Sequence, residues 1–117
     1  MELLIRSFKA LSDPGRIKIL RMLEVRPMYV CEIAAILGLA VSTVSRHLTL
    51  LKEAGFIVDK KKEKWVKYRL AEVLDSDLIS DLTDLVRYQS DLEGIGIKEQ
   101  KKVKKTTRFN YTKHRAV

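Results

Sequence analysis

Six polar residues between positions 42 and 49 carry the side chains best suited to chemistry in this 117-residue chain. They are Ser42, Thr43, Ser45, Arg46, His47 and Thr49. Their hydroxyl, guanidinium and imidazole groups can form hydrogen bonds with phosphate oxygens and with the edges of bases. This group predicts nucleic-acid binding, with Arg46 as the main contact to phosphate or guanine.

A second group of cations follows in the chain: Lys60, Lys61, Lys62 and Lys64. So many charges in five positions do not fit a hydrophobic core, and the stretch is predicted to be a turn. One interpretation is a solvated turn that only keeps the protein soluble. Beside a helix that binds nucleic acid, contact with the phosphate backbone or the minor groove is favoured.

The polar residues at 42–49 are predicted to lie on the second helix of a pair. Val30, Ile33, Ala34 and Leu37 recur at helical spacing, and Gly38 is expected to end that first helix. The second helix is predicted to run from Ser42, as its N-cap, to Ala54. Two helices joined by a glycine turn are typical of a helix-turn-helix, with Ser42–Ala54 as the recognition helix. An ordinary pair of core helices is the alternative.

After Gly55 the spacing of apolar residues changes. The segment 56–58 is short and apolar, and residues 65–70 alternate as in a strand. With the lysine-rich turn between them, they predict a β-hairpin directly after the recognition helix. This order is the winged-helix arrangement, so the predicted fold is mostly α (α+β), with about five helices and a hairpin wing.

Three further helices complete the expected domain. Leu4, Phe8 and Leu11 predict a short first helix, and Asp13-Pro14 predicts the start of a second. In that second helix, Arg16, Lys18 and Arg21 are expected to lie away from the buried stripe. The last long helix is expected over Val73–Leu92. Its many leucines favour pairing with the same helix of a second subunit over packing within one chain, so we expect a homodimer through the terminal helices.

The net charge of +8 is unevenly distributed. From Lys98 onward eight Lys and Arg face one acid, a balance of +7, which leaves +1 for residues 1–97. Within that part, residues 46–69 are basic and residues 72–93 are acidic. We expect a DNA-binding and dimerisation domain over residues 1–97 and a basic, disordered tail over 98–117.

Composition excludes several classes of protein. No apolar run is long enough to span a membrane, and charges at Glu2, Arg6 and Lys9 argue against a signal peptide. The single cysteine, Cys31, fits a reducing compartment, so a cytoplasmic protein without membrane contact is expected. The sequence shows no metal triad, no nucleophile spaced with a base and no phosphate-binding loop, so no enzyme is expected.

The segment 26–70 resembles the ArsR/SmtB family of metal-sensing repressors, and the outline extends over residues 3–93. The resemblance is carried by Val30–Ile33, Val41–Leu48, Leu51–Gly55 and Lys64–Leu70. It implies a homodimeric winged-helix repressor that binds a palindromic operator in double-stranded DNA. It also implies that a metal or metalloid effector releases the operator.

The sensor site does not carry over completely. Arsenic-sensing members have two cysteines where this chain has Tyr29 and Cys31, and the predicted last helix has no histidine for a zinc site. Three interpretations of Cys31 remain open. It is an inert thiol on a half-buried helix, which is the commonest case for a lone cysteine, or it is a metal ligand in a site completed by the partner chain, the tail or a cellular thiol. The third interpretation is a redox-sensitive thiol.

Two functions follow from these expectations. The first is a transcriptional repressor whose recognition helix enters the major groove while the wing lysines bind the backbone. The second is a winged-helix module that binds another protein and has no sequence-specific contact with DNA.

Overall fold

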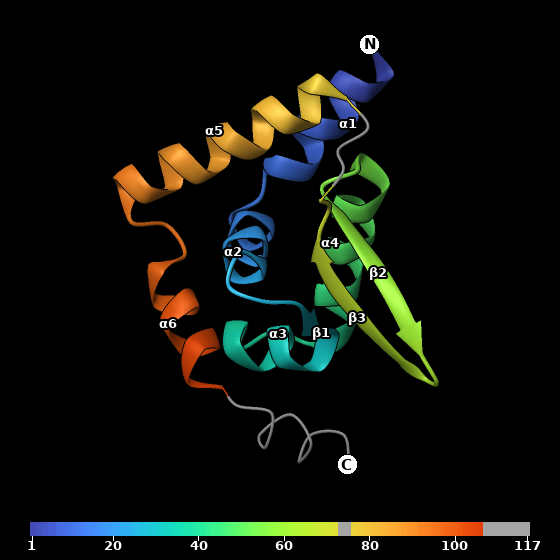
Figure 1. Ribbon diagram of the computed structural model, residues 1–117, viewed down its shortest axis with the longest axis vertical. Coiled ribbons are helices and arrows are strands. Elements are labelled where there is room, and N and C mark those ends of the chain that lie inside the picture. The colour runs from blue at the N-terminus through green and yellow to red at the C-terminus, as the bar shows by residue number, and fades with distance from the viewer. Residues whose placement is uncertain (73–75, 107–117) are drawn as a thin grey trace.

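The computed structural model describes residues 1–72 and 76–106. Within these ranges the chain forms six helices and one antiparallel three-stranded sheet with strand order β1–β3–β2 (Figure 1). The helices are α1 (Glu2–Leu11), α2 (Pro14–Leu23), α3 (Val30–Leu37), α4 (Val41–Ala54), α5 (Asp77–Glu93) and α6 (Ile97–Lys105). The strands are β1 (Met28–Tyr29), β2 (Ile57–Lys62) and β3 (Trp65–Leu70). The predicted winged helix-turn-helix is confirmed.

Helices α3 and α4 form the helix-turn-helix, with a bend of 114° between them. Gly38 ends α3 and Gly55 ends α4, both in the left-handed conformation that glycine adopts without strain. Val44, Leu48 and Leu51 are fully buried beneath α4, as their spacing predicts. The expected N-cap was wrong, because α4 begins at Val41 after Ala40, and Ser42 lies in its exposed first turn.

Helix α2 passes through the centre of the fold. Asp13 caps it by accepting hydrogen bonds from the backbone N–H groups of Gly15 and Arg16, as predicted. Arg21, which was expected to lie away from the buried stripe, is only 2% exposed. Its guanidinium group donates to Glu24 at 2.7 Å, to the carbonyl oxygen of Ile95 at 3.1 Å, and to Asp91. Burial of the charge is tolerated here because each of the three guanidinium nitrogens donates to an acceptor.

The wing is the hairpin of β2 and β3, and β1 joins the far edge of β3. The two hairpin strands pair from Ile57 opposite Leu70 to Lys62 opposite Trp65. Only Glu63 and Lys64 remain in the turn, and Glu63 has a positive φ of 58°. The lysine-rich turn that was predicted is therefore mostly strand, with its lysines at the tip of the wing.

The C-terminal part differs from the prediction in two ways. The helix expected over Val73–Leu92 is observed as α5, and residues 73–75 lie outside the described residues. It is followed by α6, so the expectation of disorder from Lys98 is wrong for residues 98–105. The many charged residues of this segment suggested disorder, but Val103 among them is fully buried where α6 packs on α2 and α3. The predicted tail beyond residue 106 lies outside the described part.

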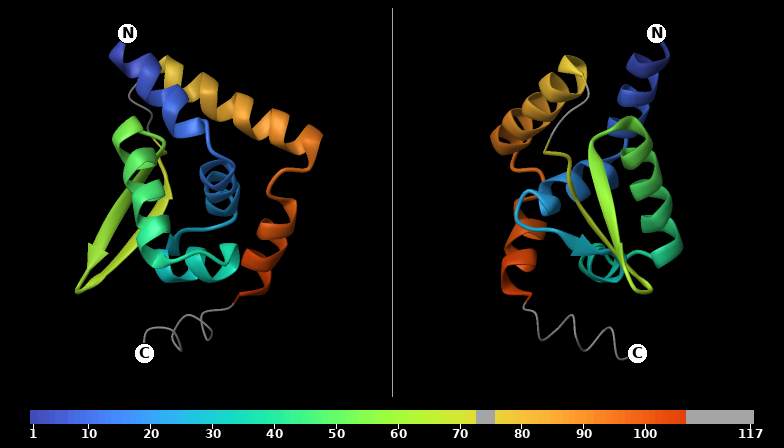
Figure 2. Two further views of the ribbon diagram at one scale, coloured as in Figure 1. Left: turned by 180° about the vertical axis from the view of Figure 1, so that it is seen from behind. Right: turned by 45° about the vertical axis from the view of Figure 1, so that its right-hand side comes forward.

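Helices α1 and α5 lie at one end of the molecule, and α6 lies on the side opposite the wing (Figure 2). No single helix in the described ranges is long and apolar enough to cross a membrane. The pair α3 and α4 meets the length and composition criteria only as a bent unit, a result that buried core helices also give.

Candidate nucleic-acid interface

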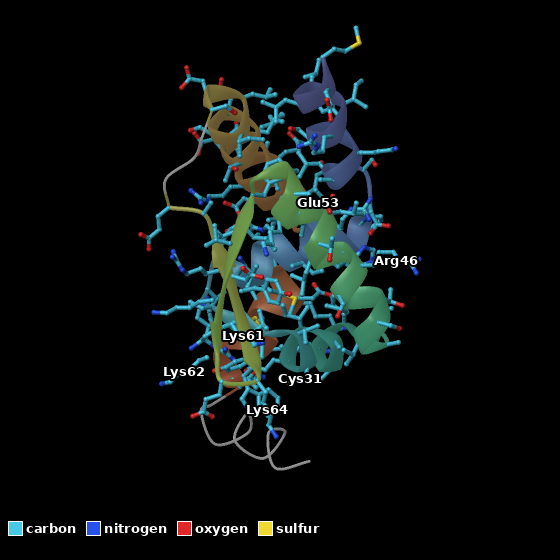
Figure 3. The ribbon with its side chains drawn as sticks, turned by 90° about the vertical axis from the view of Figure 1, so that its right-hand side faces the viewer. Cys31, Arg46, Glu53, Lys61, Lys62 and Lys64 are labelled. Atoms are coloured by element: carbon cyan, nitrogen blue, oxygen red, sulfur yellow. The ribbon has the colours of Figure 1, made fainter. Side chains whose placement is uncertain are left out.

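The outer face of α4 is polar and exposed. Ser42, Thr43, Arg46 and Thr49 are exposed, whereas Ser45 is half-buried. The hydroxyl of Thr49 donates to the carbonyl oxygen of Ser45 at 3.0 Å, so its donor is already used within the helix. Within the described part of the chain, Arg46 has no ion-pair partner, and its side chain projects away from α4 (Figure 3). Its charge is therefore available to an external anion.

His47 occupies a different position from the other predicted site residues. Its side chain is 13% exposed and faces the beginning of α2. Its Nδ1 atom lies 3.1 Å from Nη1 of Arg16, and its Nε2 atom lies 3.9 Å from Oδ1 of Asp13. The sequence placed His47 with the DNA-facing residues, but the structure places its imidazole between two helices.

The wing lysines divide between the two faces of the hairpin. Because side chains alternate along a strand and directly paired residues share a face, Lys61 lies on the same face as Val66. Lys60 and Lys62 lie on the other face, together with Trp65 and Lys67. Lys67 belongs to this basic face but was not among the predicted site residues. The signal that identifies Lys67 is its pairing with Lys60 in the hairpin, because directly paired residues share a face.

Several contacts hold the wing against the rest of the domain. Nζ of Lys52 on α4 lies 2.9 Å from Oδ2 of Asp59 on β2, and this hydrogen bond raises the pKa of Lys52. At the tip, the rings of Tyr29 and Trp65 meet edge to face with centroids 6.1 Å apart. The ammonium group of Lys64 lies 6.0 Å from the centroid of Trp65. The cations of the wing are thus carried on a braced hairpin.

The basic residues of α4 and the wing lie on one side of the molecule. Figure 3 shows Arg46 at one edge of this side and Lys61, Lys62 and Lys64 toward the tip of the hairpin. The four predicted wing lysines, Lys60, Lys61, Lys62 and Lys64, are all exposed. An extended polyanion could contact both groups at once.

Cys31 lies in the first turn of α3 and is half-buried. Burial raises the pKa of its thiol, and the charge of the neighbouring Glu32 raises it further. Among residues 1–72 and 76–106, no three His, Cys, Asp or Glu side chains lie close enough together to hold a metal ion. The described part of one subunit therefore does not fit a metal or metalloid, because one protonated thiol is a poor ligand set.

Comparison with known proteins identifies relatives over most of the domain. Residues 13–58 match the sequence profile described as "Bacterial regulatory protein, arsR family". The chain is 41% identical over 68 residues to the arsenical resistance operon repressor of Escherichia coli, covering 57% of this chain and 58% of that protein. It therefore spans little more than half the length of that relative. It is 34% identical over 79 residues to the transcriptional repressor SdpR of Bacillus subtilis, covering 68% of this chain and 88% of that one.

A solved structure shares the fold. The homodimeric winged helix-turn-helix DNA-binding domain from Mycobacterium bovis superimposes with a TM-score of 0.63 at 28% identity, covering 77% of this chain and 80% of that one. The family resemblance expected from the sequence is confirmed. The fold and the relatives are those of DNA-binding transcriptional regulators, which are not enzymes. This chain belongs to the ArsR family of bacterial regulatory proteins.

Proposed function

We propose that the protein is a homodimeric transcriptional repressor that binds a palindromic operator. The observation that carries this proposal is the exposed polar face of α4 beside a braced basic wing. In a helix-turn-helix, the second helix enters the major groove and its N-terminal residues contact base edges. Ser42, Thr43 and Arg46 occupy that part of α4.

The proposed contacts are of two kinds: contacts that recognise the base sequence and contacts with the phosphate backbone that position the protein. Arg46 would bind guanine or phosphate, and each good contact of this kind discriminates by about 1–3 kcal/mol. The wing lysines would bind the phosphate backbone, which supplies affinity without sequence preference. Because Lys61 and Lys62 lie on opposite faces of the hairpin, the wing tip would contact the backbone from within a groove.

The proposed dimer uses the end of the molecule formed by α1 and α5. Ile5 and Phe8 on α1 are 54% and 50% exposed, and Leu85 and Leu92 on α5 are 56% and 65% exposed. Large exposed apolar side chains gathered on a small domain are typical of a subunit interface. Two-fold symmetry about this end would place two copies of α4 on half-sites about 34 Å apart.

If an effector acts through Cys31, the chemistry of a thiol favours a metal or metalloid. The relative from Escherichia coli is named for arsenical resistance, and α3 packs directly on α4. The other ligands would have to come from outside the described part of one subunit. Titration of the operator complex with arsenite, cadmium and zinc, for the wild type and Cys31→Ser, tests this point. Identical release curves would exclude Cys31 from sensing.

The function itself is tested with the full chain and DNA from upstream of its own gene. Sedimentation should give the mass of a dimer, and footprinting should show a protected palindrome. A monomer in solution together with no protected site would contradict the proposal. That outcome, combined with binding to a protein partner, would instead support the interaction module.

A further inference from the structure

The geometry points to a positioning role for His47: together with Asp13 and Arg16 it sets the angle of α4 relative to α1, and so the half-site separation that the dimer accepts. We call these three residues the α2–α4 clamp. The inference rests on the proposed function and deepens it. It replaces the expectation that His47 touches DNA.

Arg16 is the centre of the clamp and joins three helices. Its Nε atom donates to the carbonyl oxygen of Ala10 at 2.7 Å, and Nη2 donates to that of Lys9 at 3.0 Å. Both carbonyls belong to the last turn of α1. The remaining Nη1 atom lies 3.1 Å from Nδ1 of His47 on α4. One side chain of α2 therefore connects the end of α1 to the middle of the recognition helix.

The arrangement of donors fixes how His47 sits. A guanidinium group can only donate, so Nδ1 of His47 must accept and the ring proton must lie on Nε2. Nε2 faces Oδ1 of Asp13 at 3.9 Å. The same carboxylate oxygen accepts from the backbone of Gly15 at 2.7 Å and of Arg16 at 3.2 Å. The imidazole is thus held between the cation and the N-cap of α2.

Close approach of the two helices depends on Gly15. A Cβ atom at this position would lie 3.0 Å from Oδ1 of Asp13 and 3.3 Å from Nε2 of His47. Such contacts are tighter than ordinary van der Waals packing, so any larger residue would move the imidazole or the carboxylate. The absence of a side chain at Gly15 therefore lets the imidazole of His47 lie close to Asp13.

The position of α1 explains why the clamp matters for DNA. This helix carries the exposed Ile5 and Phe8 of the proposed dimer surface. It also contacts α4 directly, where Nη1 of Arg6 lies 3.5 Å from the carbonyl oxygen of Glu53. The recognition helix of each subunit is therefore oriented through α1, and the clamp is a second polar connection between α1 and α4, beside the contact of Arg6 with Glu53. Loss of the clamp should weaken the preference of the dimer for one half-site spacing without removing any DNA contact.

The test compares the footprinted operator with versions lengthened or shortened by two base pairs between half-sites. Binding is measured over a range of salt for the wild type, His47→Ala, His47→Asn and Arg46→Ala. His47→Ala should reduce the preference for the natural spacing by about tenfold, with the salt slope unchanged. Asn carries an acceptor near the position of Nδ1, so His47→Asn should restore most of that preference. Arg46→Ala should instead weaken binding at every spacing.

The outcomes separate the inference from the proposed function. If His47→Ala lowers the salt slope by about one unit, the imidazole contacts a phosphate and the clamp is not its role. If His47→Ala keeps the wild-type spacing preference, the inference is also overturned. Thermal unfolding of each variant shows that it is folded, and Gly15→Ala provides a second route to the same loss of preference. Failure of the wild type to bind any DNA would overturn the proposed function and the inference with it.

Discussion

Gly96 packs directly against the buried side chain of Arg21. A Cβ atom at position 96 would lie only 2.6 Å from the Cβ atom of Arg21. Gly96 has a φ of 80° and is the N-cap of α6, so this contact fixes where α6 begins. Arg21 in turn pairs with Asp91 on α5 and with Glu24, the C-cap of α2. The end of α5 and the start of α6 are therefore held by one charged residue of α2.

Gly96→Ala should destabilise the protein more than Gly94→Ala. Both glycines have a positive φ, but no atom lies within 4 Å of a Cβ built at Gly94. The control therefore carries only the backbone strain, about 1 kcal/mol. Gly96→Ala adds the clash with Arg21, which should cost roughly 1–3 kcal/mol more. Chemical unfolding measures both, and equal losses would show that the packing against Arg21 is unimportant.

Asp13→Ala should lower the free energy of unfolding at pH 7 by about 1 kcal/mol, because it removes the cap of α2. Burial raises the pKa of Asp13, but hydrogen bonds from the backbone N–H groups of Arg16 and Gly15, together with the neighbouring His47 and Arg16 side chains, outweigh burial and lower it below 3.8. A carboxyl whose folded pKa is depressed contributes stability above its unfolded pKa, and loses it as the pH falls through the folded value.

The difference between wild type and Asp13→Ala should therefore shrink as the pH is lowered below 3.8. Urea unfolding between pH 7 and pH 3 measures this change. Asp13→Asn keeps a capping oxygen and should lose less at pH 7. A difference between wild type and Asp13→Ala that stays constant over this range would show that the charge of Asp13 is not involved.

The double variant Lys61→Glu with Lys62→Glu should weaken binding to all DNA sequences alike. It should also reduce the slope of log affinity against log salt concentration, by the amount that corresponds to the loss of about two phosphate contacts. Lys101→Glu with Lys102→Glu is the matched control, because α6 lies on the opposite side from the wing (Figure 1). The control should keep the wild-type salt slope. A wing variant with an unchanged slope would show that the hairpin does not contact phosphates.

Cys31 should react slowly with iodoacetamide at pH 7 in the folded protein. Burial and the charge of Glu32 raise its pKa above 9.0, so little of the reactive thiolate is present. The same chain in denaturant is the control and should react faster. Faster alkylation in the folded state would indicate an activated thiolate and would favour a sensing role for Cys31.

Local signals predicted the parts of the fold that depend on neighbours in sequence. Gly38, Gly55 and the Asp13-Pro14 pair each specify a helix end by their own backbone chemistry, and all three were placed correctly. The burial of Arg21 could not be predicted in this way. Two of its acceptors, Asp91 and Ile95, lie 70 and 74 residues away in the chain.

The candidate site shows the same division. The exposed face of α4 follows from helical spacing, and Arg46 lies where it was expected. His47 lies at the boundary of that face, and only its contacts with Asp13 and Arg16 show that it turns toward α2. Helix α6 was missed because five lysines surround its one fully buried residue, Val103.

The affinity of Arg46→Ala for the operator, at fixed salt, tests the central claim most directly. Thr49→Ala is the matched control on the same face, since the hydroxyl of Thr49 is already bonded within α4. Removing the guanidinium group should weaken operator binding by about 1–3 kcal/mol and relax the base preference at one position in each half-site, while the control binds like the wild type. Unchanged operator affinity for Arg46→Ala would contradict the assignment of α4 as the recognition helix.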